Sequence, residues 1–94
     1  MVSRLVARIR ILPAEADSNL DSLIDGLRSK VPEGMELKAY TKEPIAFGLY
    51  AIIGDFLIDD DEGQMDKLED SIKKINGVGE IEVINISRQS VKIK

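Results

Sequence analysis

Cysteine and histidine are both absent from this 94-residue sequence, and each absence removes a class of chemistry. Without cysteine there is no disulfide framework and no thiolate nucleophile. Without histidine the chain lacks the commonest general base near neutral pH and the commonest metal ligand. The remaining carboxylates, lysines, tyrosines and hydroxyls are not spaced like a catalytic pair, and no phosphate-binding glycine motif is present. We therefore expect a protein without catalytic residues, bound metal or cofactor.

Long hydrophobic runs are also missing. The apolar stretches are far shorter than the ~20 residues that span a bilayer. Met1–Arg4 leads directly into an alternating segment and not into the apolar core of a signal peptide. With 44% hydrophobic and 32% charged residues, the composition is that of an ordinary soluble domain. We expect one domain covering residues 1–94, located in the cytoplasm and not bound to a membrane.

The charges are unevenly distributed along a chain whose formal net charge is −4. This balance disfavours general nucleic-acid binding, which needs cations to displace the counterions of phosphate. Basic residues crowd the beginning and the end of the chain, at Arg4, Arg8, Arg10, Arg88, Lys92 and Lys94. An acidic run, Asp59–Glu62, lies between them, but its twelfth position is Asp70 and not the glutamate of a calcium loop. The ordinary interpretation of all three clusters is a solvated surface.

Hydrophobic periodicity predicts three elements in the first half of the chain. Residues 3–12 alternate and are followed by Pro13, which is typical of a strand and its end. Cap residues at positions 17–19 precede apolar residues at helical spacing, which predicts a helix over residues 18–30. Residues 35–40 alternate again and predict a second strand.

The second half repeats this order. Leu49–Ile58 is almost continuously apolar, as in a central strand, and Asp59–Gly63 reads as a loop. A second helix follows, with one apolar face and a glycine stop, at Met65, Leu68, Ile72, Ile75 and Gly77. In the last strand the apolar face changes at Val83–Ile84, which predicts a β-bulge or a strand that is apolar on both sides. Residues 89–94 form a tail.

This order of elements predicts an α+β, ferredoxin-like βαββαβ sandwich. We expect a four-stranded antiparallel sheet of order 4-1-3-2 with both helices on one face. The other face would be uncovered and would carry either an apolar interaction surface or scattered surface hydrophobes. The candidates for this face are Val6, Tyr50 or Ile52, Phe56, and Ile84 or Ile86.

The stretch Glu43–Leu49 joins the two halves and is unusually apolar for a connection. Pro44 removes a backbone donor, and Gly48 permits backbone angles that are closed to other residues. Connections normally run over the surface and are polar. Ile45 and Phe47 must therefore either tuck under the domain or be offered to a partner.

The same stretch resembles the Pro-Ile-Ala-Phe-Gly-Leu signature of the archaeal translation elongation factor 1-beta family, which is similar to the C-terminal exchange domain of the eukaryotic factor. Residues 6–13, 31–34 and 77–83 fit the first strand, the turn before the second strand and the start of the last strand of this family. The resemblance therefore covers the whole chain.

The resemblance implies a guanine-nucleotide exchange factor that acts by protein binding and makes no covalent bond. The implied partner is elongation factor 1-alpha, the GTPase that delivers aminoacyl-tRNA. The implied process is GDP release and GTP loading during polypeptide elongation. The chain would act as a monomer and would not contact nucleic acid directly.

The resemblance also implies roles for individual residues. Phe47 matches a phenylalanine that anchors in a pocket of the GTPase, with Ile45 beside it and with Pro44 and Gly48 shaping the loop. Eukaryotic relatives direct a lysine near the C-terminus at the Mg²⁺ site of the GTPase. Lys92 and Lys94 lie near the corresponding end, although the residues around them differ from the eukaryotic ending.

An alternative is a free-standing ferredoxin-like module that binds RNA or a small regulatory ligand. RNA-binding domains of this fold class stack bases on aromatic side chains of the central strands. Residues 3–12 contain no aromatic residue, so RNA binding would depend on phosphate contacts of Arg8 and Arg10.

Overall fold

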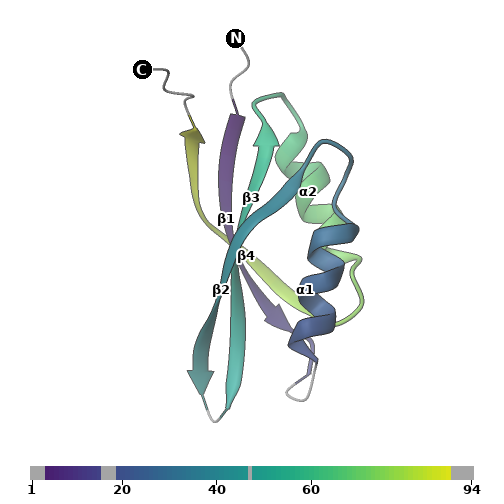
Figure 1. Ribbon diagram of the computed structural model, residues 1–94, viewed down its shortest axis with the longest axis vertical. Helices are drawn as coiled ribbons and strands as arrows, with labels where there is room; N and C mark the ends of the chain where they lie inside the picture. The colour runs from purple at the N-terminus through teal and green to yellow at the C-terminus, as the bar shows by residue number, and fades with distance from the viewer. Residues whose placement is uncertain (1–3, 16–18, 47, 90–94) are drawn as a thin grey trace.

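Six elements follow one another in the predicted order (Figure 1). The computed structural model describes residues 4–15, 19–46 and 48–89. The elements are β1 (Arg4–Pro13), α1 (Leu20–Ser29), β2 (Glu36–Ala46), β3 (Leu49–Asp59), α2 (Gln64–Lys73) and β4 (Val78–Gln89). The two helices and the strands β1 and β3 agree with the predicted ranges to within about two residues.

The four strands form one antiparallel sheet of order β2-β3-β1-β4, which is the predicted order read from the opposite edge. β1 and β3 are the inner strands, and β2 and β4 are the edges. Both helices lie on the same face of the sheet (Figure 1). The ferredoxin-like prediction is confirmed.

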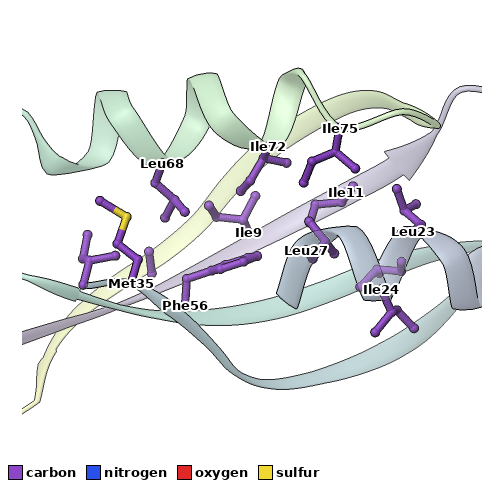
Figure 2. Packing of buried hydrophobic residues seen from close by; sticks show 13 residues of the cluster. Ile9, Ile11, Leu23, Ile24, Leu27, Met35, Phe56, Leu68, Ile72 and Ile75 are labelled. Atoms are coloured by element: carbon purple, nitrogen blue, oxygen red, sulfur yellow. The ribbon is translucent and has the colours of Figure 1, made fainter. Parts of the chain in front are cut away.

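The core lies between this face and the helices (Figure 2). Its largest fully buried side chains come from both inner strands and both helices: Phe56, Ile9, Ile11, Leu23, Leu27, Ile52, Ile58, Leu68 and Ile72. Each buried side chain of this size contributes about 1.5–3 kcal/mol to folding. The helix-facing side of the sheet therefore determines the stability of the molecule.

The start of α1 is fixed by its cap. Asn19 accepts a hydrogen bond from the backbone N–H of Ser22 at its Oδ1 atom, at 3.2 Å, as the cap residues predicted. Gly26, one turn before the end of α1, packs against Ile75, because a Cβ atom at position 26 would lie 2.7 Å from Ile75 Cγ2. This contact brings the end of α1 against the segment that follows α2.

β2 is longer than the sequence predicted. The stretch from Glu43 to Ala46 is strand and pairs with β3, so the interpretation of these residues as a connection was wrong. Pro44 is compatible with a strand here because an edge strand leaves alternate N–H groups outside the ladder. The pairing shifts between Pro44 and Ala46, and Ile45 is the extra residue of this irregularity.

β4 contains the predicted irregularity. Arg8 pairs with Asn85 and Ile9 pairs with Val83, so Ile84 is the extra residue of a β-bulge. The bulge is one of the two alternatives that the sequence left open at Val83–Ile84.

The face of the sheet that points away from the helices, here called the open face, differs from the expectation. Ile52 and Phe56 are fully buried in the core and do not lie on it. Ile86 pairs with Ala7, a core residue, and so points to the helix side. Val6 does lie on the open face, opposite Leu57. Because residues 49–58 are almost continuously apolar, no alternation in this segment distinguishes the residues of one face from those of the other.

Candidate functional site

The β2–β3 hairpin extends beyond the four-stranded part of the sheet. The pairing of β1 with β3 ends at Ile11 and Ile52, whereas β2 and β3 continue through the pair of Glu43 and Ala51 to that of Ala46 and Leu49. This two-stranded end reaches past the N-terminal end of α1 (Figure 1). We call residues 43–46 and 48–50 the hairpin tip.

Two large apolar side chains of the hairpin tip, Ile45 and Tyr50, are exposed to solvent. Ile45 and Tyr50 are each 40% exposed, whereas Ala51 and Ile52, the next residues of β3, are fully buried. Pro44 is exposed as well. The described residues of this stretch are therefore offered outward and are not tucked under the domain. Phe47 lies outside the described residues, and its anchoring role stays a prediction.

Gly48 follows Phe47 with φ +80°, in the left-handed region that favours glycine. A Cβ atom at this position would meet no other atom within 4 Å, so the requirement for glycine comes from the backbone and not from crowding. The predicted role of Gly48 in shaping the turn depends on this geometry.

A shallow, mostly apolar pocket of about 320 Å³ lies beside the hairpin tip. It is lined by residues that follow β1 or end it and by two residues of the tip: Leu12, Pro13, Ala14, Glu15, Ile45 and Leu49. The wall opposite the hairpin is held in place, because the N–H of Ala14 donates to the carbonyl oxygen of Gly77 at 2.8 Å. This pocket has room for an apolar side chain, and sequence reasoning missed it because its walls are distant in the chain.

Three arginines of β1 lie on the open face, and each faces a carboxylate on another strand. The Nε–oxygen distances are 3.2 Å for Arg4 and Asp59, 2.9 Å for Arg8 and Asp55, and 3.0 Å for Arg10 and Glu43. Arg88 of β4 is likewise 3.2 Å from Asp60. These four arginines thus pair with carboxylates, of which Asp59 and Asp60 belong to the acidic run.

Arg8 makes the best aligned of these pairs. Its Nη2 also donates to Asp55 Oδ2, at 3.2 Å, so the guanidinium holds both carboxylate oxygens. These hydrogen bonds, and then the charge of Asp55, raise the pKa of Arg8 above its usual value. RNA binding through Arg8 and Arg10 would require a phosphate to replace carboxylates that are already in place, and the geometry does not favour this alternative.

The described part of β4 ends at the end of the sheet opposite the hairpin tip. β4 ends at Gln89 beside Arg4, and Arg4 pairs with Asp59 at the end of β3 that is far from the hairpin tip (Figure 1). β3 is 11 residues long, so at ~3.3 Å per residue these ends are roughly 35 Å apart. Lys92 and Lys94 lie outside the described residues.

Neither metal ligation nor membrane insertion finds support in the described part of the chain. Within residues 4–15, 19–46 and 48–89, no group of three or more acidic, histidine or cysteine side chains could hold a metal ion. Among the same residues, no helix is long and apolar enough to cross a membrane.

Comparison with known families decides the assignment. The model of the EF-1 guanine nucleotide exchange domain matches residues 6–88. The chain belongs to this family. The match includes the described residues of the hairpin tip. An exchange domain acts on a bound nucleotide without covalent chemistry, so the predicted family, exchange function and non-enzymatic class are confirmed.

Relatives of this exchange domain come from several archaea. The chain is 39% identical to elongation factor 1-beta of Methanocella arvoryzae over 79 residues. This alignment covers 84% of the chain and 89% of the relative. Elongation factor 1-beta of Methanothermobacter thermautotrophicus is 38% identical over 84 residues, with 89% and 94% covered. The protein of that name from Hyperthermus butylicus is 37% identical over 90 residues, with 95% and 98% covered.

Proposed function

We propose that this exchange domain acts on elongation factor 1-alpha, from which it releases GDP so that GTP can load during polypeptide elongation. Membership of the exchange-domain family supports the proposal. The observation that carries it is the hairpin tip, where Ile45, within the motif behind the family resemblance, and Tyr50, directly after that motif, are exposed.

The proposed mechanism is thermodynamic linkage. Bound GDP is held through its phosphates and Mg²⁺ by the GTPase. A domain that binds the nucleotide-free GTPase more tightly than the GDP form weakens GDP binding by the same ratio. This mechanism needs a docking surface and no acid–base group.

We assign the docking surface to the hairpin tip. Phe47 is the proposed anchor, and Ile45 is a second apolar contact beside it. Pro44 and Gly48 would hold the backbone of the turn in one shape, through a fixed φ in Pro44 and the left-handed φ of +80° in Gly48. An aromatic anchor that enters a pocket is the usual centre of binding energy in an interface.

Lys92 and Lys94 are proposed to act on the Mg²⁺ site of the GTPase. The chain continues beyond Gln89 from the end of the sheet opposite the hairpin tip. Five residues extend at most ~18 Å, so this tail and the tip would contact different parts of the GTPase. Removal of residues 90–94 separates the two contributions.

The decisive experiment is the Phe47→Ala variant in an assay of fluorescent GDP release from elongation factor 1-alpha. Loss of a central anchor costs ≥2 kcal/mol of binding, so we expect at least about a tenfold smaller stimulation at subsaturating concentration. The matched control is Tyr40→Ala, which removes an exposed aromatic side chain of the same hairpin outside the tip. Equal stimulation by Phe47→Ala and wild type would remove Phe47 from the interface. Absence of stimulation by the wild type at micromolar concentration would overturn the proposed function.

We also propose that residues 1–94 act as one monomeric domain in the cytoplasm, without direct contact to nucleic acid. The pairing of the arginines of β1 with carboxylates supports the last point. Sedimentation equilibrium of the purified chain gives the mass that tests the monomer.

A further inference from the structure

Arg10 lies on an inner strand but faces carboxylates on both edge strands. Its Nε is 3.0 Å from Glu43 Oε1 on β2, and its Nη1 is 3.8 Å from Glu82 Oε1 on β4. In the order β2-β3-β1-β4, β3 lies between Arg10 and Glu43. One side chain therefore connects β1 across β3 to the far edge of the sheet.

The surface of β3 accommodates this crossing. Arg10 pairs with Ile53, and Glu43 pairs with Ala51, so the side chain of Arg10 must pass over this part of β3. Ala51 is fully buried although its register places it on the open face, outside the core cluster. A methyl group at position 51 leaves room for an overlying guanidinium.

Glu43 marks the base of the hairpin tip. It belongs to the first pair of β2 and β3 beyond the last pair of β1 and β3. From there outward the hairpin has two strands only, and an isolated two-stranded ribbon is marginally stable and strongly twisted. The ribbon extends by about 10 Å, so a tilt of about 15° at its base would move its end by about 3 Å.

We propose that Arg10 is a positioning residue that fixes the direction of the hairpin tip through Glu43. On the other face, Lys42 is 3.8 Å from Asp21 of α1, but Asp21 is 88% exposed and this contact is weak. Arg10 is more sheltered, at 33% exposed. Its Nε is buried without a hydrogen bond of good geometry, so the attraction to Glu43 is mainly that of opposite charges. The structural part of this proposal is that Arg10 fixes the direction of the tip in the free protein. Its consequence for GTPase docking rests on the proposed function.

The structural part is tested on the free protein by residual dipolar couplings of the N–H bonds at Ile45, Ala46, Gly48 and Leu49. We expect Arg10→Gln and Glu43→Gln to change these couplings in the same way, and the double variant to add nothing further, because both remove one pair. Couplings in the rest of the sheet should keep their wild-type values.

Two controls match these variants. Arg8→Gln breaks an ion pair on the same strand and the same face, away from the tip. Glu82→Gln removes the second carboxylate of Arg10 on the side away from the hairpin. We expect both to leave the couplings of the tip unchanged. If the Glu43→Gln variant keeps the wild-type couplings of the tip, the proposal is overturned. This test remains decisive if the Arg10→Gln variant does not fold.

The functional part is tested by stimulated GDP release as a function of exchange-domain concentration. We expect Arg10→Gln to raise the half-saturating concentration about fivefold while the maximal rate stays within about twofold, because the tip keeps its residues and loses its direction. Arg10→Lys, which keeps the charge, should recover part of the loss. An unchanged half-saturating concentration would overturn this role even where the wild type is active. An inactive wild type would instead refute the proposed function and leave the coupling measurements to decide the positioning role.

Discussion

The four-stranded part of the sheet and the hairpin tip use similar residues for opposite purposes. Ile52 and Ile45 lie on neighbouring strands of the same hairpin, yet Ile52 is fully buried and Ile45 is 40% exposed. Ile52 belongs to the core cluster under the helices, whereas the hairpin tip reaches past the N-terminal end of α1 (Figure 1). Helix cover, and not residue type, decides whether an isoleucine of this hairpin stabilises the fold or is available to a partner.

The two edge strands offer a second comparison. Each has an irregularity in its pairing, at Ile45 in β2 and at Ile84 in β4. Both side chains are exposed, Ile84 at 48%. Bulges commonly protect the edges of sheets from pairing with other chains. The bulge at Ile45 lies in the proposed docking surface, and the bulge at Ile84 lies outside it. The two isoleucines can therefore be substituted as a matched pair.

The largest effect should come from the covered part of the sheet. Phe56→Ala removes a fully buried ring from the centre of the core and should lower the free energy of unfolding by about 3–5 kcal/mol. Chemical denaturation followed by circular dichroism measures this loss. The same truncation at Phe47 should leave stability nearly unchanged if the comparison holds. A loss below about 1 kcal/mol for Phe56→Ala would contradict the assignment of this ring to the core.

A smaller effect should separate backbone strain from partner contact. Gly48→Ala and Gly34→Ala both place a side chain at positive φ, at +80° and +90°, with no atom nearby. Each should cost about 1–2 kcal/mol of stability because a left-handed backbone disfavours a Cβ atom. Gly48 lies in the tip and Gly34 lies in the turn before β2, so GDP release should slow with Gly48→Ala alone. Equal rates of GDP release with both variants, at temperatures where both are folded, would contradict a special role of the hairpin tip.

The smallest effect on stability should come from the two bulge residues. Ile45→Ser and Ile84→Ser replace side chains that already face solvent, so each should change the free energy of unfolding by less than about 1 kcal/mol. Stimulated GDP release should fall several-fold with Ile45→Ser and should stay at the wild-type level with Ile84→Ser. A similar decline in both would show that the docking surface includes β4.

Local patterns were sufficient for the fold. The alternation of residues 3–12, the apolar spacing of the helices and the cap at Asn19 predicted six elements in the order that the structure shows. The change of apolar face at Val83–Ile84 indicated either a bulge or a strand that is apolar on both sides, and the structure shows the bulge. These features depend on near neighbours in the chain.

Features that depend on register were not readable. Arg10 and Glu43 are 33 positions apart in the chain, and nothing local to either residue shows that β3 brings them together. Pro44 and Gly48 suggested a connection, because the sequence does not show that β2 is an edge strand where proline is tolerated. The identity of the site came from the resemblance of the central motif, since apolar residues in a short segment carry no partner information in themselves.

The neighbouring positions of Arg4 and Gln89 have a practical consequence for engineering. They are paired residues on adjacent strands, at the end of the sheet far from the hairpin tip. A short linker could therefore join Gln89 to Arg4, and new termini could be opened in the exposed loop before α2 at Gly63, which tolerates a break better than a strand. Such a circular permutant would keep the β2–β3 hairpin continuous and would omit residues 90–94.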